Sequence, residues 1–353
     1  MTNRGNDDIA MPMGRILPAE WEEQDGVLLA WPHKDSDWRP YLAEVEPVFV
    51  EIATQISLFE RVVIITPDKA TVAEKLRRAG AIADRIAMYE IGTNDTWTRD
   101  FGPITVFEDE RPLLLDFTFN GWGLKFAADL DNQATRQLRR AGAFGRTPLK
   151  TVGLVLEGGS IESDGKGTLL STEECLLGPN RNPHLSREAI EEALAGQFGT
   201  DHVLWLGNGF LEGDDTDSHI DTLARLCPDD TILYQACPDR QDLHFEALQS
   251  MAAELEAFRT RDGRPYRLIP LPWPSPRHDE DGQRLPATYA NFLVINGAVL
   301  VPTYQDANDA AALDAVREAF PERTVIGIDC LPLIVQHGSL HCLTMQIPKG
   351  VLP

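Results

Sequence analysis

The sequence predicts an α/β fold, and three observations lead to that prediction. Short apolar runs typical of buried strands alternate with segments whose apolar residues recur at three- and four-residue spacings. Loops rich in Gly, Pro, Asp and Asn follow many of the apolar runs. These loops return at a roughly constant spacing along the chain. Alternation of this kind is typical of α/β units in which helices pack outside sheets.

The predicted elements follow one another in the same order in both halves of the chain. The strands are expected at 26–31, 61–66, 84–91, 202–206, 289–295, 298–302 and 323–328. The helices are expected at 44–59, 68–79, 186–197, 241–258 and 309–319. Residues 265–288 contain six prolines and several charges, which predicts an exposed loop that is either a lid or an inert insertion.

The loops suggest a repeated unit. They fall at 31–40, 92–103, 157–167 and 207–219, a spacing of about 60–70 residues that is typical of a repeated supersecondary unit whose loops meet at one centre. No linker divides the chain. We therefore expect one domain over residues 1–353, with residues 1–15 as a loose N-terminal segment.

The charge balance limits the partners. The chain has 353 residues with 32 Lys+Arg and 55 Asp+Glu, a formal net charge of −23. Such a surplus of carboxylates argues against a nucleic acid partner and against an anionic membrane surface, since both require a basic face. It permits a cationic ligand, although most of the surplus is explained by solubility.

The cysteine pattern predicts a reduced, cytoplasmic protein. The five cysteines are scattered and odd in number, and no CxxC pair occurs among them. The N-terminal residues lack the uninterrupted apolar run of a signal peptide. No stretch approaches the 18 or so apolar residues of a membrane span, so we expect no membrane partner.

Common cofactor and metal motifs are missing from the sequence. It contains no P-loop, no GxGxxG after a strand, no calcium loop, no HExxH and no GxSxG. A zinc site built from His337, His341 and Cys342 would lack an identifiable fourth ligand. We therefore predict no metal and no cofactor.

Three polar clusters remain that carry chemically active side chains. They are WTRDFGP at 97–103, DSHID at 217–221 and GSLHCLT at 338–344. An extended DSHID segment would direct His219 and Asp221 to the same face. Taken alone, Cys342 is typical of a small buried apolar residue, Asp221 of a cap or a partner of Arg225, and Asp100 of a turn. Taken together, a thiol, an imidazole and two carboxylates indicate a Cys–His hydrolase with an excess of negative charge.

Six blocks of the sequence resemble the agmatine deiminase family. This group is also called the bacterial (Porphyromonas-type) peptidylarginine deiminase family, and it belongs to the pentein superfamily. The blocks run in order from Trp21 to Pro348: WEEQDGVLLAWPH, NDTWTRDFGP, LEGGSIESDGKGTLLSTEECLLGPNRNP, DDTDSHIDTLAR, YANFLVINGAVLVPTY and GSLHCLTMQIP. The resemblance implies a pentein five-bladed α/β propeller with pseudo-fivefold symmetry and a central active site.

The resemblance also implies an activity. It is the hydrolysis of agmatine to N-carbamoylputrescine and ammonia, a step of polyamine biosynthesis. We expect no cofactor, and the sequence leaves open whether the protein is a homo-oligomer. Deimination of peptidyl-arginine or free arginine stays open as an alternative. A non-catalytic pentein that acts as an interaction module is a more distant one.

The matched motifs imply roles for individual residues. Cys342 matches the nucleophile and His219 the catalytic histidine, while Asp100 and Asp221 match the two carboxylates that bind guanidinium. Two further positions are implied by the same comparison. Glu157 matches an acid that holds the histidine or the substrate, and Trp97 an aromatic residue beside the substrate.

The residue types fit that chemistry. A guanidinium is planar and carries five donors, so carboxylates bind it with charge-assisted hydrogen bonds. A thiolate then adds to its central carbon, and an imidazole transfers the protons. Because the two aspartates disfavour a neighbouring negative charge, we expect the Cys342 thiol to react poorly until a cation is bound.

Overall fold

The computed structural model describes residues 14–353, and five of the sheets in this part share one strand pattern. Each has two antiparallel strands, then a helix, then a strand parallel to the second one. The antiparallel pairs are β5–β6 (Ile104–Glu108, Arg111–Thr118), β8–β9 (Ile161–Ser163, Thr168–Thr172), β11–β12 (Ala224–Cys227, Thr231–Gln235), β16–β17 (Leu293–Ile295, Ala298–Thr303) and β19–β2 (Thr344–Pro348, Gln24–Ala30).

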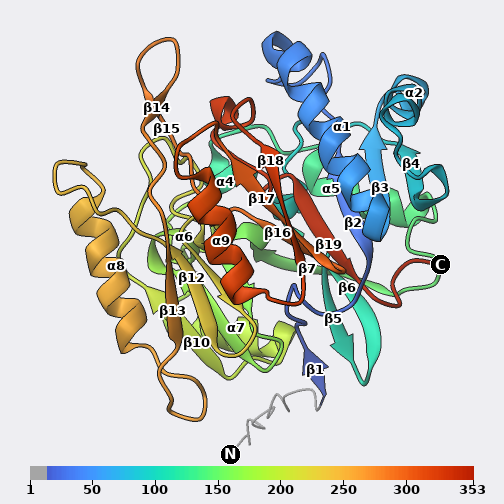
Figure 1. The fold of residues 1–353 in the computed structure, drawn as a ribbon. Coiled ribbons are helices and arrows are strands. Elements are labelled where there is room, and N and C mark those ends of the chain that lie inside the picture. The colour runs from blue at the N-terminus through green and yellow to red at the C-terminus, as the bar shows by residue number, and fades with distance from the viewer. Residues whose placement is uncertain (1–13) are drawn as a thin grey trace, which may run out of the picture.

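Helices lead from each pair to the parallel strand. These helices are α5 (Asp131–Arg140), α7 (Arg187–Phe198), α8 (Phe245–Ala257), α9 (Asp309–Ala319) and α1 (Leu42–Phe59). The strands that follow them are β7 (Leu149–Val155), β10 (His202–Leu206), β13 (Arg267–Leu271), β18 (Thr324–Asp329) and β3 (Arg61–Thr66). In the last sheet, α2 (Lys69–Ala79) leads to a fourth strand, β4 (Ile86–Glu90), which pairs parallel with β3. Figure 1 shows α8, α1 and α2 at the outer edge of the molecule and α9 on the side that faces the viewer.

Short elements complete the described chain. They are β1 (Arg15–Ile16), which pairs with β5, the helices α3 (Thr98–Phe101), α4 (Gly121–Leu124) and α6 (Glu173–Leu176), and the hairpin β14–β15 (Arg277–His278, Arg284–Leu285). The 3-10 turns are η1 (Arg39–Tyr41), η2 (Ala83–Arg85), η3 (Gly158–Ser160), η4 (Ile220–Thr222) and η5 (Ile334–Gln336).

Local sequence explains where the regular helices begin and end. Asp68 accepts a hydrogen bond from the backbone N of Thr71 at 3.0 Å and caps α2, and Ser186 caps α7 in the same way. Both helices end at a glycine in the left-handed conformation, Gly80 and Gly199. The α/β class predicted from the sequence is confirmed, and the predicted strands at 61–66 and 202–206 have the observed bounds.

Three predicted segments differ most from the structure; in addition, the helix predicted at 241–258 spans Phe245–Ala257 and the strand predicted at 84–91 spans Ile86–Glu90. Within 265–288, predicted to be an exposed loop, Arg267–Leu271 forms β13; as the outer strand of its sheet it can contain Pro270, whose missing N–H does not interrupt the sheet. Within 289–295 only Leu293–Ile295 is a strand, since the residues before it form a loop held by side chains. Of the predicted loose segment 1–15, residues 1–13 lie outside the described part, and Arg15 is paired in β1.

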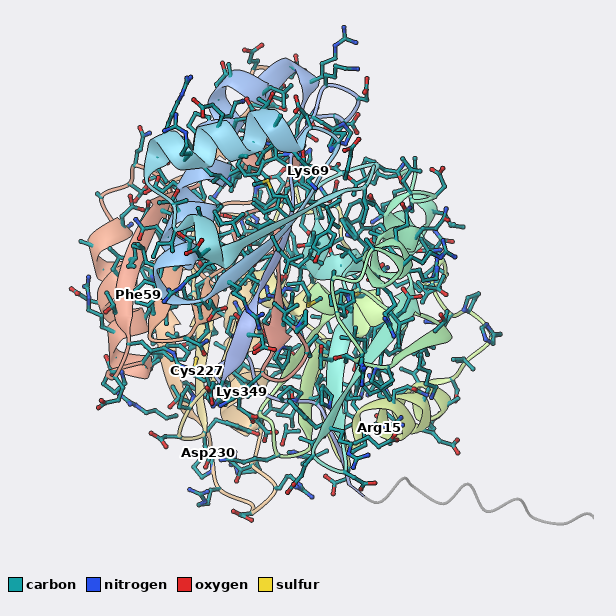
Figure 2. All side chains as sticks on the ribbon, turned by 90° about the vertical axis from the view of Figure 1, so that its right-hand side faces the viewer. Arg15, Phe59, Lys69, Cys227, Asp230 and Lys349 are labelled. Carbon is teal, nitrogen blue, oxygen red and sulfur yellow. The ribbon has the colours of Figure 1, made fainter. Side chains whose placement is uncertain are left out.

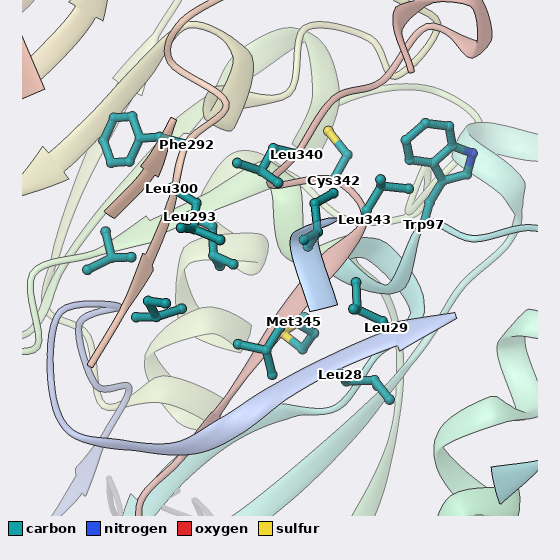
Figure 3. Packing of buried hydrophobic residues seen from close by; sticks show 14 of the residues in the cluster. Leu28, Leu29, Trp97, Phe292, Leu293, Leu300, Leu340, Cys342, Leu343 and Met345 are labelled. Atoms are coloured by element: carbon teal, nitrogen blue, oxygen red, sulfur yellow. The ribbon is translucent and has the colours of Figure 1, made fainter. Parts of the chain in front are cut away.

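An apolar core fills the space between the sheets. Figure 3 shows Leu28 and Leu29 of β2 near Met345 of β19, with Leu293 and Leu300 of the β16–β17 pair close by. All five side chains are at most 3% exposed and belong to one cluster. In Figure 2, charged side chains lie all around the outline of the molecule, as expected from the net charge. No helix in residues 14–353 is long and apolar enough to cross a membrane.

Candidate active site

The three polar clusters predicted from the sequence meet at one buried place. Asp100 lies in α3, His219 and Asp221 lie at η4, and Cys342 lies two residues before β19. An ideal Cβ built on Gly159 of η3 would lie 2.7 Å from His219 Nδ1, 2.9 Å from Asp100 Oδ1 and 3.0 Å from Asp221 Oδ2. The three side chains therefore surround one point.

The local conformation of the DSHID segment differs from the prediction. The residues after His219 form a 3-10 turn and not an extended strand. Asp214 holds the approach to this turn, since its carboxylate accepts hydrogen bonds from the backbone N of Thr216 and, at 2.7 Å, of Ser218. The turn, and not strand alternation, brings His219 and Asp221 to the site.

Cys342 is buried beside negative charge. Its side chain is 6% exposed, and its Sγ lies 3.8 Å from Asp221 Oδ2. Burial raises the pKa of the Cys342 thiol well above its usual value, and the carboxylates of Asp221 and Asp100 raise it further. The direction agrees with the poor reactivity expected of the free protein. Asn291 Nδ2 donates a hydrogen bond to the same sulfur at 3.1 Å.

Asp221 is held by a histidine that the sequence analysis considered only as a zinc ligand. His341 Nδ1 lies 2.7 Å from Asp221 Oδ2, and His341 Nε2 lies 2.8 Å from Glu20 Oε2. Burial alone would raise the pKa of Asp221, but the hydrogen bond and charge of His341 lower it. The other oxygen, Asp221 Oδ1, is buried without a partner. His337 instead bonds the carbonyl of Gly213, so His337, His341 and Cys342 form no ligand cluster in the described chain.

Asp100 has neutral donors. Trp122 Nε1 donates to Asp100 Oδ2 at 2.9 Å, and the backbone N of Gly159 donates to Oδ1 at 3.0 Å. Burial raises the pKa of Asp100, and the nearby charge of Asp221 raises it further. Trp122 has φ 54°, a left-handed value that is strained for a bulky residue, between the flexible Gly121 and Gly123. Trp122 had no role in the sequence prediction; its GWG context is the only signal for it.

His219 is fully buried, and neither ring nitrogen has a hydrogen-bond partner. Its Nδ1 lies 3.6 Å from Asp100 Oδ1. Burial lowers the pKa of His219 to about 3, so the imidazole is neutral at pH 7 in the free protein. Because buried polar groups are rarely left unpaired, these nitrogens and Asp221 Oδ1 are available to hydrogen-bond a polar ligand or water.

Glu157 is tied to an arginine. Arg181 Nε donates to both carboxylate oxygens of Glu157, at 3.0 and 2.9 Å, and Arg181 Nη1 donates to Asp217 Oδ2 at 2.7 Å. Glu157, Cys175 and His219 place potential ligand atoms within 4.8 Å of one another, as do Glu20, Glu162 and His341. Arginines already pair with the carboxylates of both groups, Arg181 in the first and Arg225 in the second. The sequence motifs did not single out Arg181, and they indicated Arg225 only as a partner of Asp221.

Trp97 lines the same cavity as Cys342. Its ring lies 5.6 Å from that of Trp38, and a Cβ on Gly338 would lie 2.3 Å from the Trp97 ring. The glycine of the GSLHC turn is therefore required for this close approach. Figure 3 shows Trp97 and Cys342 from different parts of the chain on the same side of the core.

A cavity of about 140 Å³ leads from the surface to Cys342. Its lining residues are Asp37, Asp95, Trp97, Asp100, Trp122, Phe126, Asp214, Asp215, Thr216, Thr222, Gln336, His337, Gly338 and Cys342. Five of them are aspartates, three are aromatic, and none is Lys or Arg. Burial raises the pKa values of Asp95 and Asp215 to about 6. The cavity is therefore suited to a narrow cationic ligand.

A buried thiol beside a carboxylate, with a buried imidazole near the same carboxylates and an acidic cavity, fits a thiol-dependent hydrolase for a cationic substrate. Comparison with known proteins agrees. The family model described as Porphyromonas-type peptidyl-arginine deiminase matches residues 16–348. The chain therefore belongs to this family, as its sequence blocks had indicated, and it is a guanidine-hydrolysing enzyme.

Several relatives are similar over nearly their whole length. The agmatine deiminase of Stutzerimonas stutzeri is 34% identical, with 95% of this chain and 96% of the relative covered. The structure of C. jejuni agmatine deiminase with substrate bound has a TM-score of 0.88 at 40% identity, covering 96% of this chain and 97% of the other. That of Enterococcus faecalis has a TM-score of 0.85 at 31% identity, covering 95% and 96%. A dimethylarginine dimethylaminohydrolase, 12% identical with a TM-score of 0.51, shares the fold.

Proposed function

We propose that the protein hydrolyses agmatine to N-carbamoylputrescine and ammonia, with Cys342 as nucleophile. The observation that carries the choice of substrate is the composition of the cavity wall, which has five aspartates and no Lys or Arg. Agmatine has a guanidinium at one end and an ammonium at the other, so both ends are attracted to such a wall. Free arginine would bring a carboxylate that has no cationic partner there.

Asp100 and Asp221 are the proposed guanidinium ligands. Asp221 Oδ1 has no partner in the free protein, and Asp100 has only neutral ones. A guanidinium between them would form charge-assisted hydrogen bonds on both sides and fix its central carbon for attack. The cation also offsets the two negative charges that disfavour the thiolate.

In the first half of the reaction, the Cys342 thiol transfers its proton to His219, which is neutral in the free protein. The thiolate adds to the guanidinium carbon to give a tetrahedral adduct. His219 then returns the proton to one terminal nitrogen, the C–N bond breaks, and ammonia leaves. An amidino group remains attached to Cys342 through a C–S bond.

In the second half, His219 takes a proton from water while the oxygen adds to the amidino carbon. The C–S bond breaks as the new carbonyl forms, and the proton from His219 restores the thiol. The proton lost from the hydroxyl of the adduct passes to solvent, where it converts the released ammonia to ammonium. The product carries a ureido group in place of the guanidinium. Glu157, held by Arg181, and Trp97, on the cavity wall, are proposed to keep His219 and the substrate in place.

The proposed architecture is a single domain over residues 1–353, a five-bladed propeller with pseudo-fivefold symmetry and a central active site. Five sheets with one strand pattern support it. So do helices that contact both their own sheet and the preceding one: α1 packs on β3 and β18, and α9 on β18 and β13. The five cysteines, none of which forms a disulfide, support a cytoplasmic location.

Ammonia release tests the substrate. We expect agmatine to be turned over fastest and free arginine slowest, since arginine carries a carboxylate. Argininamide, in which an amide replaces that carboxylate, should lie between them. The Cys342→Ala variant should release none, and a parent protein stopped during turnover should carry the mass of an amidino adduct. Activity of Cys342→Ala equal to the parent would exclude the covalent route. Turnover of an arginyl peptide alone would replace agmatine by peptidyl-arginine, the function that the family description names.

A further inference from the structure

We propose that Asn291 is a further catalytic residue, whose side-chain amide donates a hydrogen bond to the Cys342 sulfur and stabilises the thiolate. The inference rests on the proposed role of Cys342 as nucleophile. Asn291 is fully buried, in the loop that precedes β16. No other side chain in the described part of the molecule donates a hydrogen bond to this sulfur.

The position of Asn291 in its sheet matches those of the site residues in the other four. Asp100 lies four residues before β5, Glu157 four before β8, Asp221 three before β11 and Cys342 two before β19. The fourth sheet begins at β16, two residues after Asn291. Each sheet thus supplies one polar side chain from the segment before its first strand, and Asn291 is the contribution of the sheet to which the sequence analysis assigned none.

The orientation of the amide follows from its backbone contacts. Asn291 Oδ1 accepts hydrogen bonds from the backbone N of His341 at 2.9 Å and of Cys342 at 3.2 Å. An NH₂ group could not accept either bond. The amide oxygen must therefore face these N–H groups, which directs Nδ2 to the sulfur at 3.1 Å and to the carbonyl of Asp221 at 3.4 Å.

The loop around Asn291 is itself fixed. Arg225 Nη1 donates to the carbonyls on both sides of Asn291, those of Ala290 and Phe292. The other guanidinium nitrogens of Arg225 are paired with Glu162 and Glu20. The amide therefore needs no reorganisation when the thiolate forms, which is the condition for effective electrostatic stabilisation.

The Asn291 amide and the two nearby aspartates have opposite effects on the Cys342 thiolate. Burial raises the pKa of the Cys342 thiol, Asp221 and Asp100 raise it further, and the Asn291 side chain lowers it. A bound guanidinium offsets the negative charges of the aspartates, but this positive charge is lost as the guanidinium is converted to the ureido group. The amide remains in place when sulfur is again the leaving group, so its effect should appear in kcat more than in KM.

Asn291→Asp tests the proposal with an isosteric change. The aspartate keeps an oxygen for the two backbone N–H groups and replaces the donor to sulfur by a second oxygen. The thiolate of Cys342 is titrated by its ultraviolet absorbance, with Cys342→Ala as the blank. We expect the midpoint to rise by at least about one pH unit, and kcat for agmatine to fall by at least about tenfold, with a smaller change in KM.

Two further variants separate catalysis from loop structure. Asn296→Asp is the matched control, since Asn296 at the other end of β16 also binds the backbone through Oδ1 and Nδ2, at 3.0 and 2.8 Å from Gln24. It should leave both the midpoint and kcat unchanged. Asn291→Ala, which removes donor and acceptor together, should lower kcat at least as much as Asn291→Asp.

Asn291→Asp adds a negative charge as well as removing the donor, so Asn291→Ala, which adds none, carries the decision. The proposal predicts that the thiol midpoint rises in Asn291→Ala too. A parental midpoint in Asn291→Ala, as a purely structural role predicts, would overturn the proposal, and so would an effect of Asn296→Asp equal to that of Asn291→Asp. If the parent released no ammonia from agmatine, the proposed function would fail, whereas a raised thiol midpoint in Asn291→Ala would still support the hydrogen bond.

Discussion

The substitution Gly159→Ala places a methyl group at the point that the proposed site residues surround. The new Cβ would lie 2.9 Å from Asp100 Oδ1 and 3.0 Å from Asp221 Oδ2, closer than ordinary van der Waals contact. It would also lie 2.7 Å from His219 Nδ1. All three atoms belong to side chains, and the φ angle of Gly159 is outside the left-handed region, so the backbone can accept alanine.

The magnitude follows from the bonds that the methyl group prevents. A hydrogen bond to a charged group contributes about 1.5–3 kcal/mol. Loss of one or two guanidinium contacts therefore removes about 1.5–6 kcal/mol of transition-state binding. Since about 1.4 kcal/mol corresponds to a tenfold change, kcat/KM for agmatine should fall by roughly 10- to 10⁴-fold.

The assay is steady-state ammonia release, accompanied by thermal unfolding. Gly153→Ala is the matched control, because Gly153 is an exposed residue of β7 with nothing within 4 Å of an added Cβ. It should retain the parental kcat/KM. A Gly159→Ala protein that unfolds at the parental temperature and keeps kcat/KM within about threefold would refute the placement of the guanidinium between the two aspartates.

Three further changes test the surroundings of the site. Trp122→Phe removes the N–H that bonds Asp100 but keeps an aromatic wall, and should lower kcat/KM by about tenfold in the same assay. Arg181→Leu leaves Glu157 buried without its partner and should cost about 3–5 kcal/mol in urea unfolding. Burial raises the pKa of Glu60 to about 7, so the folded protein holds this proton more tightly than the unfolded chain. Stability should then decline as the pH rises from 4.5 to 7, by up to about 3 kcal/mol, and Glu60→Gln should remove that part of the decline in unfolding at pH 5 and pH 8.

The elements that the sequence predicted best are those whose own residues determine them. The strand at 61–66 is a continuous apolar run, and the helix at 309–319 has apolar residues at helical spacing; both have the observed bounds. The strand Arg267–Leu271 was missed because its proline is tolerated only at the edge of a sheet, a property of the fold and not of the segment.

The candidate site likewise contains residues that the sequence predicts and residues that it does not. The side chains with distinctive chemistry, such as Cys342 and His219, could be selected from short motifs. Their supporting partners could not, because these come from distant parts of the chain. Arg225 was considered as a partner of Asp221, four residues away, but it pairs with Glu162 and Glu20, 63 and 205 residues away. Nothing in a single sequence indicates which arginine is buried.

The supporting partners also explain how one site can contain two carboxylates and a thiol. His341 occupies one oxygen of Asp221 and stabilises its charge, so this carboxylate is ionised before a ligand arrives. Asp100 has only neutral donors, and burial together with the charge of Asp221 raises its pKa. A guanidinium would lower the pKa of Asp100 again, since it provides the positive charge that Asp100 lacks. The same cation offsets the charges that oppose the Cys342 thiolate. In the proposed mechanism, substrate binding and activation of Cys342 are therefore one electrostatic event, and a neutral ligand of the same shape would bind without activating the thiol.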